Sequence, residues 1–409
     1  MKHPKSDTQS QNHASYEALH FILACCQEEP TNADIHLILS SIQDSTFDIQ
    51  DLISLSTHHG VLPTVYKTLK NISTKHPLPP TLDLSLKQVL NKFRPQYQSI
   101  ARRNMLISSE LLYVIKLLKR NGIEALPFKG PVLSQMAYGD ITLRQYGDLD
   151  ILVRKKDIYK VDKLLKEQGY KRLPELTSVQ ERTWIRFAHD LGFIHPVKGV
   201  HLEMHWSFLD EDCPVQVDLK HFWIDTQRIV MNSHDIPTFS KENLLIYLSI
   251  HGSKHLWERI EWIVDLDRLI RNNQIDWKKV EQQTKNTAYK KMIYLGLFLC
   301  NSLFDTPLPK SLHHTIENHP VMQSTTNFIL HSWKTPQTVF KTTSTMLRLF
   351  PGIKEKALFI HKVILKPSLN EYMVVDLPQI LYWVYYFIRP WILFKKYFKK
   401  FYCSTDKLN

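Results

Sequence analysis

The stretch RQYGDLDILV, residues 144–153, places two aspartates one residue apart among aliphatic residues. In an extended strand, Asp148 and Asp150 share one face, and the aliphatic residues that alternate with them share the other. The aliphatic face suits a core, but neighbouring carboxylates repel each other unless a cation neutralises them. The stretch therefore predicts a strand that either ends in solvent or presents its aspartates to a positive group.

Composition limits the classes of protein to be considered. The 409 residues are 43% hydrophobic and 22% charged, which excludes wholesale disorder and leaves room for two or three domains. A formal charge of +12 suits an anionic partner such as a nucleotide or a membrane surface. The five cysteines have no metal-binding spacing, and the N-terminus lacks the pattern of a signal peptide. These features predict a cytoplasmic location.

Apolar periodicity predicts a helix-rich α+β fold, in which a small mixed sheet is flanked by helical regions on both sides. The expected segments are a disordered tail 1–14, an N-terminal helical region 15–120, an α/β core 121–225, a C-terminal helical region 226–365 and an aromatic and basic tail 366–409. No concentrated basic stripe lies within the core, so nucleic acid is not the expected partner.

A turn upstream of the two aspartates has the chemistry of an anion site. In IEALPFKGPVLSQMAYG, residues 123–139, a short apolar strand is followed by Lys129-Gly130 and then by a helix that begins near Pro131. A glycine before a helix N-terminus lets backbone amides approach an anion, and a lysine adds charge suited to phosphate. A plain tight turn explains the same residues, so the turn alone decides nothing.

A third acidic residue lies on a later strand. In HLEMHW, residues 201–206, alternation places His201, Glu203 and His205 on one face. Glu203 can thus join the two aspartates from a neighbouring strand. The same histidines allow a zinc site, but residues along one strand spread too far to close on one ion unaided. Asp265 and Asp267 repeat the D-x-D spacing on an expected helix, where they point in different directions and predict no site.

Together these motifs resemble a known family. FKGPVLSQMAYGDITLRQYGDLDILV, LLKEQGY and HLEMHWSF follow one another in the order seen in uncharacterised bacterial nucleotidyltransferase proteins of the polymerase-beta-type superfamily. The resemblance covers roughly residues 100–285. It implies a small nucleotidyltransferase core within the helix-rich α+β fold.

The resemblance also implies the roles of the acidic residues. Asp148, Asp150 and Glu203 are expected to be catalytic and to hold two Mg²⁺ ions. His205 and His251 are expected to be auxiliary residues. His251 and His255 stand one helical turn apart, a spacing that suits packing or a phosphate contact as well as metal binding.

The expected nucleotide contacts come from Lys129, Gly130 and Arg144. The superfamily usually has Gly-Ser or Gly-Gly at this turn, whereas this chain has Lys129-Gly130-Pro131, so Lys129 is expected to replace the missing serine as a point charge. Arg144 either reaches a phosphate or is a salt-bridged arginine at the surface.

The expected activity is Mg²⁺-dependent transfer of a nucleoside monophosphate from a nucleoside triphosphate to an unknown acceptor, with release of pyrophosphate. The acceptor is a small molecule, a sugar or a protein. The alternative is a catalytically silent nucleotide-binding protein or a scaffold at a membrane surface.

The unusual phosphate turn favours that alternative, and the tail leaves it open. ILYWVYYFIRPWILF, residues 380–394, is too short and interrupted to span a bilayer. It suits either an interfacial helix in peripheral membrane contact or packing onto the helical body.

Overall fold

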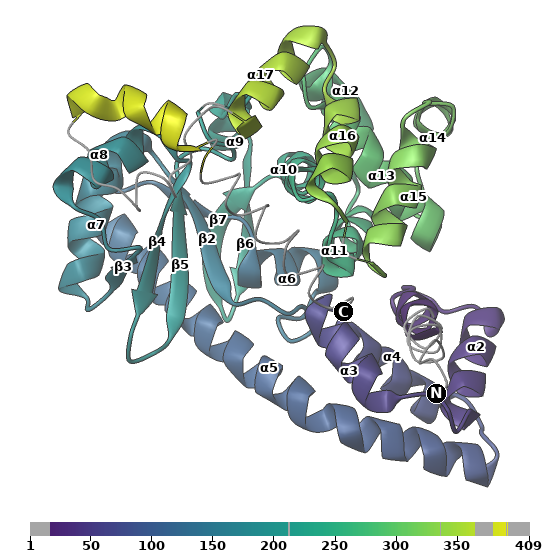
Figure 1. The fold of residues 1–409 in the computed structure, drawn as a ribbon. Helices are drawn as coiled ribbons and strands as arrows, with labels where there is room; N and C mark the ends of the chain where they lie inside the picture. Colours follow the sequence, from purple (N-terminus) through teal and green to yellow (C-terminus); the bar gives the residue numbers. More distant parts are fainter. Residues whose placement is uncertain (1–16, 212, 336, 365–378, 390, 392–409) are drawn as a thin grey trace, which may run out of the picture. The chain divides into compact units, whose positions relative to one another are not determined.

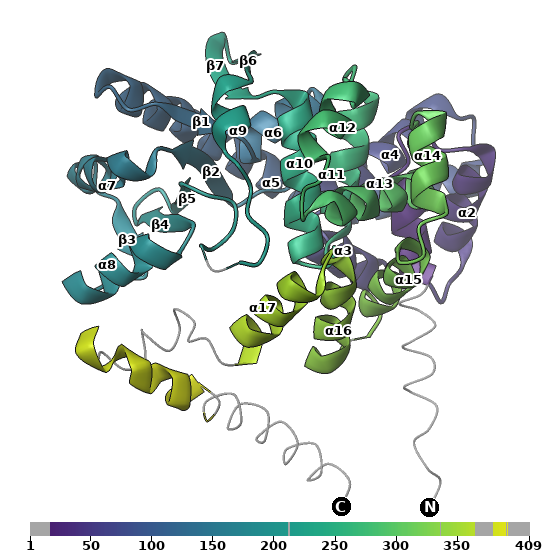
Figure 2. The same ribbon diagram turned by 90° about the horizontal axis from the view of Figure 1, so that it is seen from above.

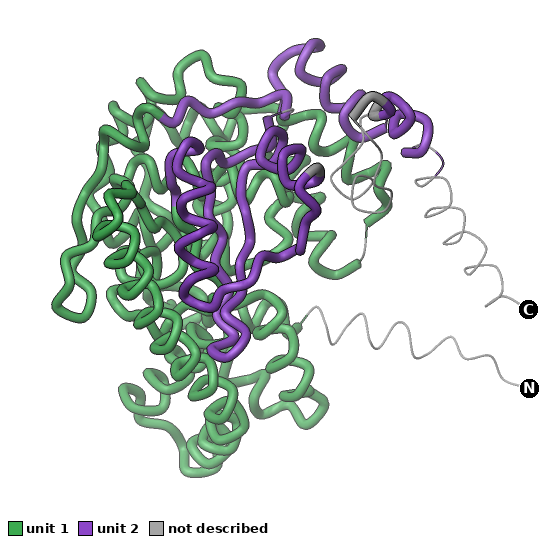
Figure 3. Tube along the Cα trace, turned by 90° about the vertical axis from the view of Figure 1, so that its left-hand side faces the viewer, with its two compact units in different colours: residues 1–151, 220–349 green, residues 152–219, 350–409 purple. Residues whose placement is uncertain are grey.

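A computed structural model describes residues 17–211, 213–335, 337–364, 379–389 and 391, and Figures 1 and 2 show the ribbon from two sides. The expected disordered tail 1–14 lies outside the described residues. The chain divides into two compact units, which Figure 3 colours separately: residues 1–151 with 220–349, and residues 152–219 with 350–409. The five segments expected from the sequence stay a prediction.

The first unit begins with helices. After a helical stretch at 17–25 come α2 (Asn32–Gln43), α3 (Ile49–His58), α4 (Leu62–Lys75) and the long α5 (Pro80–Arg120). Local chemistry sets their starts, since Thr31 forms a capping box with Asp34 and Asp48 caps α3. The 41-residue α5 packs against α2, α4 and α6.

Short elements then lead to the aspartates. Strand β1 (Ala125–Pro127) precedes α6 (Gly130–Tyr138), and β2 (Asp148–Val153) follows after a loop. The sequence predictions of a strand, a Lys129-Gly130 turn, a short helix ending at Gly139 and a DLDILV strand are confirmed. Gly139 adopts the left-handed conformation that ends many helices.

A hairpin in the first unit was not predicted. Strands β6 (Thr226–Met231) and β7 (His234–Phe239) pair in antiparallel register within a segment expected to be helical. Their two turn residues, Asn232 and Ser233, both have positive φ angles, as a two-residue hairpin turn requires. The pattern was missed because this turn lacks the glycine that usually marks it.

The remaining helices of the first unit complete its core. They are α9 (Lys220–Ile224), α10 (Lys241–Lys254), α11 (Ile260–Arg271), α12 (Trp277–Thr284), α13 (Lys290–Phe304), α14 (Lys310–Glu317), α15 (Met322–Ser332) and α16 (Val339–Leu349). Helices α10, α11 and α13 pack on one another, and α11 also packs on α6. Figure 2 shows this group of helices from above.

The second unit contains the antiparallel part of the sheet. Its elements are the end of β2, a 3-10 turn (Lys155–Asp157), α7 (Ile158–Glu167), β3 (Lys171–Leu173), α8 (Ser178–Phe187), β4 (Asp190–His195), β5 (Val200–His205), α17 (Ile353–Ile364) and a 3-10 helix (Gln379–Val384). Strands β4 and β5 pair so that Glu203 lies opposite Gly192.

Strand order in the sheet is β1-β2-β5-β4-β3, so the expected helix-rich α+β fold with a small mixed sheet is confirmed. One detail differs from the sequence analysis. Leu152, which shares a face with the two aspartates, is fully buried, as are Leu149 and Ile151. Strand β2 is therefore buried on both faces, and only Asp148 at its start is partly exposed.

The expected tail 366–409 lies mostly outside the described residues. Within the described part of the chain, every helix is too short or too polar to cross a bilayer.

Candidate active site

The positive group beside the aspartates is Lys129. Asp150 is only 2% exposed, and its Oδ1 lies 3.5 Å from the Lys129 Nζ. Burial disfavours the charged form of Lys129, yet the nearby Asp150 carboxylate, helped by Tyr247 and Asp148, holds the pKa of Lys129 above its ordinary value. Lys129 thus stays charged and neutralises Asp150 within the fold.

Gly130 is required by the way the turn approaches strand β2. Its φ is +53°, in the left-handed region, and a Cβ placed there would lie 3.1 Å from the Asp148 backbone oxygen. Lys129 is the N-cap residue of α6, whose first amides follow directly. The glycine therefore lets the start of α6 and the start of β2 lie against each other.

Helix α5 fixes the loop that leads into β2. The Asn104 amide donates to the backbone oxygens of Ile141 and Arg144, at 2.8 and 2.7 Å. Tyr146 lies 3.2 Å from the Ser108 hydroxyl. These buried contacts set the position of the backbone immediately before Asp148.

Arg144 forms a buried ion network. It is 5% exposed, its Nη2 lies 3.0 Å from Glu261 Oε1, and its Nε lies 2.9 Å from both carboxylate oxygens of Asp265. Tyr138 also donates to Asp265, at 2.8 Å. Of the two sequence interpretations of Arg144, the salt bridge is present, but the side chain is buried and not at the surface. Its role in nucleotide binding stays a prediction.

Three carboxylates on α11 serve structure. Burial raises the pKa of Glu261 to about 7, although Arg144 acts in the opposite direction. Asp265 binds Arg144, while Asp267 is bound by Arg271 and by the Thr306 hydroxyl. The second D-x-D pair, for which the sequence predicts no site, thus connects α11 to Arg144 and Thr306 in other parts of the first unit.

In the second unit, Glu203 and His205 begin a chain of polar contacts. His205 Nε2 lies 3.3 Å from Glu203 Oε2, and the His205 ring lies 5.8 Å from that of His189. His189 Nδ1 is 2.7 Å from Asp210 Oδ1, and Lys362 donates to Asp210 at 3.1 Å.

The contacts around Asp210 also set its charge. Despite burial, the hydrogen bond from His189 and the charge of Lys362 hold the pKa of Asp210 below its usual range. Sequence analysis missed His189 and Asp210, since neither belongs to a motif of recognisable spacing.

Metal-ligating side chains are present on both acidic strands. Asp148 and Asp150 lie on β2, and Glu203 and His205 lie on β5. Carboxylates and an imidazole are donors that a divalent cation accepts, so the chemistry of these side chains fits such an ion. Their part in metal binding stays a prediction. His201, also on β5, is exposed.

His251 lies in the first unit among aromatic side chains. It is on the last turn of α10, and its ring is 5.8 Å from that of Tyr247 and 5.0 Å from that of His255. Tyr247 in turn lies 5.7 Å from the Lys129 Nζ. Within the first unit, Tyr247 therefore lies close to both His251 and Lys129.

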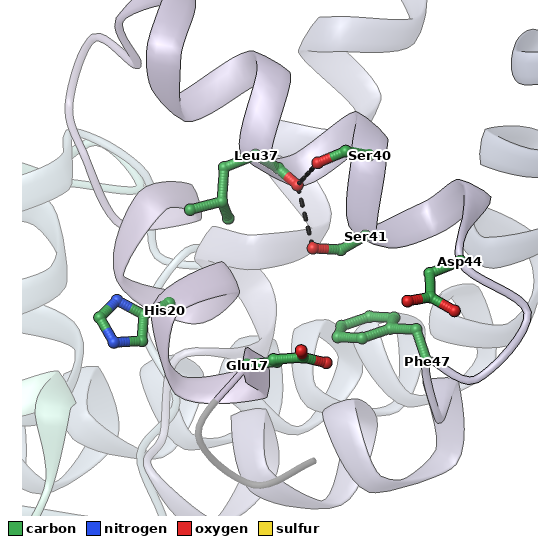
Figure 4. A pocket seen from close by; sticks show the side chains of 7 residues that line it. All are labelled: Glu17, His20, Leu37, Ser40, Ser41, Asp44 and Phe47. Atoms are coloured by element: carbon green, nitrogen blue, oxygen red, sulfur yellow. Dashed lines mark hydrogen bonds between the residues drawn. The ribbon is translucent and has the colours of Figure 1, made fainter. Parts of the chain in front are cut away.

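An open hollow of about 380 Å³ lies elsewhere in the first unit, among the N-terminal helices (Figure 4). None of the predicted site residues lines it. Its lining residues are Glu17, His20, Leu37, Ser40, Ser41, Asp44 and Phe47.

The fold and these residues together describe a protein built like a nucleotidyltransferase: a small mixed sheet with acidic residues on β2 and β5, beside a glycine turn that begins a helix. Comparison with family models agrees. The model described as "Uncharacterised nucleotidyltransferase" matches residues 45–305, more than half of the chain, and the chain belongs to that family. A search of curated proteins gave no match, and neither did a search of solved structures.

Proposed function

We propose that this protein transfers a nucleoside monophosphate from a nucleoside triphosphate to an acceptor, with release of pyrophosphate. A nucleophilic oxygen of the acceptor attacks the α-phosphorus. The bond from the α-phosphorus to the oxygen that it shares with the β-phosphorus breaks, and this oxygen leaves with pyrophosphate. The acceptor is a small molecule, a sugar or a protein. The observation that carries the proposal is the family match over residues 45–305, and the acidic residues on β2 and β5 support it.

The acidic residues would hold the metal. In the proposal, Asp148, Asp150 and Glu203 bind two Mg²⁺ ions with His205 as an auxiliary residue. Mg²⁺, when bound, would neutralise the triphosphate and the charge that develops during transfer. Glu203 is half-buried, and we assign it the further task of accepting the proton of the acceptor.

Lys129 and the start of α6 would orient the phosphates. The support is that Lys129 stays charged while it neutralises Asp150, and that α6 begins directly after it. Binding of a triphosphate with its cations can replace the contact between Lys129 and Asp150. The phosphate oxygens would then neutralise Lys129, and the cations would neutralise Asp150.

Calorimetry with a non-hydrolysable nucleoside triphosphate tests this proposal. Because the acidic residues bind a nucleotide only through a cation, we expect binding in Mg²⁺ and a loss of at least about tenfold in affinity in EDTA. Asp150→Asn measured in Mg²⁺ should resemble the wild type measured in EDTA. Equal affinity in the two buffers would contradict the metal-dependent site.

A second candidate function is peripheral membrane contact, for which the observation is the exposure of three aromatic side chains. Trp383, Phe387 and Trp391 are 61%, 71% and 58% exposed and follow one another at intervals of four residues. Large aromatic rings in such numbers suit the headgroup region of a bilayer. Such contact would place a cytoplasmic enzyme or scaffold at a membrane surface.

We expect that replacing Trp383, Phe387 and Trp391 together by serine will release the protein from anionic phosphatidylglycerol vesicles without lowering its melting temperature. The reason is that exposed rings contribute to vesicle binding but not to the core. A sedimentation assay measures it. Phe340→Ser is the control, because Phe340 on α16 is an aromatic residue outside the tail and is more exposed than any of the three. Unchanged sedimentation of the triple variant would exclude membrane contact through these rings.

A further inference from the structure

Three partly exposed rings gather where α10 ends and α11 begins. The His251 ring lies 5.0 Å from both His255 and Trp262, and His255 lies 5.5 Å from Trp262. His255 is exposed, and the other two are half-buried. We call His251, His255 and Trp262 the ring shelf. An indole and two imidazoles are thus in contact with one another while remaining partly exposed to solvent.

The turn that carries the ring shelf is rigidly built. Trp257, within this turn, is fully buried, and its indole donates to the Ser253 hydroxyl at 3.2 Å. A Cβ at Gly252 or Gly296 would lie 2.6 or 2.9 Å from the Trp257 ring, so both glycines make room for it.

The backbone of the same turn is also unusual. Leu256 and Trp257 both have positive φ angles, 47° and 50°, which side chains of this size adopt at a cost in free energy. The two residues stand between His255 and the start of α11, which carries Trp262.

The ring shelf is connected to the predicted phosphate residue. Tyr247 stacks on His251 with ring centroids 5.8 Å apart and an interplanar angle of 26°. The Lys129 Nζ lies 5.7 Å from the centre of the same Tyr247 ring. A cation suited to phosphate, a buried tyrosine and an exposed aromatic surface thus follow one another within the first unit.

We propose that the ring shelf stacks the base of the nucleoside triphosphate whose phosphates lie at Lys129. This inference rests on the proposed function, and it adds the part of the protein that binds the planar heteroaromatic ring. His255 is the exposed ring of the three, and Trp262 and His251 are half-buried and in contact with it. Stacking uses the π face that every base has, so the ring shelf is expected to bind the four common bases with little discrimination.

Binding measurements with two probes test the proposal. The probes are ATP and inorganic tripolyphosphate, which has the phosphates without a base, each titrated calorimetrically in Mg²⁺. Removal of a stacking ring weakens binding by about 5- to 150-fold. We therefore expect Trp262→Leu to lose ATP affinity in that range and to bind tripolyphosphate like the wild type, while Trp262→Phe retains most of the ATP affinity.

A matched control is Trp277→Leu, the same change at a half-buried tryptophan on α12. It should bind both probes like the wild type. The ring shelf is overturned if Trp262→Leu binds ATP normally, or if it loses ATP and tripolyphosphate to the same extent, which would indicate general damage. Failure of the wild type to bind either probe would instead overturn the proposed function itself.

Discussion

Asp150→Asn is expected to lower nucleotide transfer by several orders of magnitude and the free energy of unfolding by only about 1–3 kcal/mol. Asparagine keeps the shape of the side chain but removes the charge that holds a cation. From sequence alone, loss of like-charge repulsion predicts no loss of stability. The 3.5 Å contact with Lys129 changes that expectation, since the substitution leaves a buried ammonium without this partner charge. Label transfer and urea unfolding measure the two effects.

A second substitution separates the loss of activity from the loss of stability. In Lys129→Met with Asp150→Asn, both charges of the pair are absent, so stability should return toward that of the wild type. Activity should stay absent, because the carboxylate is still missing. Asp148→Asn, at the partly exposed start of β2, is expected to unfold like the wild type and to be impaired in transfer. Recovery of transfer in the double variant would mean that Asp150 serves only the architecture.

Arg144→Met is expected to lower the free energy of unfolding by about 3–5 kcal/mol, because it leaves Glu261 and Asp265 buried without their shared cation. Urea unfolding monitored by circular dichroism measures this. Arg144→Lys should recover only part of the loss, since an ammonium cannot replace the fork that contacts both carboxylates.

The matched control for Arg144 lies on the hairpin. Arg228 pairs with Asp235 between β6 and β7, but both side chains are exposed. Arg228→Met should therefore cost no more than about 1 kcal/mol. If Arg144→Met unfolds like the wild type and loses only nucleotide affinity, Arg144 is a phosphate ligand and not an anchor of the fold.

Local sequence patterns predicted the parts of the site that local geometry determines. Alternation in DLDILV and HLEMHW predicted strands β2 and β5 and placed Glu203 and His205 on one face. The Lys129-Gly130-Pro131 turn and the glycine at 139 predicted the limits of α6. These features depend on residues that are only a few positions apart in sequence. Hydrophobic periodicity and helix capping act over that range.

Contacts between distant residues could not be predicted in the same way. Arg144 and Asp265 are 121 residues apart in sequence, and no pattern near either residue indicates the other. The same holds for Lys129 as the partner of Asp150 and for His189 as the partner of Asp210. From sequence, Lys129 is expected to contact phosphate and Asp265 is expected to belong to no site. Their buried partners, Asp150 and Arg144, lie in other elements, so neither ion pair could be inferred.

The most direct test of nucleotidyl transfer compares two positions of one label. Purified protein, Mg²⁺ and cell extract as the source of acceptor are incubated with a triphosphate labelled at the α- or at the γ-phosphate, with Asp150→Asn as the blank. Transfer of a nucleoside monophosphate predicts an acceptor labelled only from the α-phosphate, and γ-label recovered in pyrophosphate. Acceptor labelled from the γ-phosphate, or labelled equally by Asp150→Asn, would contradict the proposal.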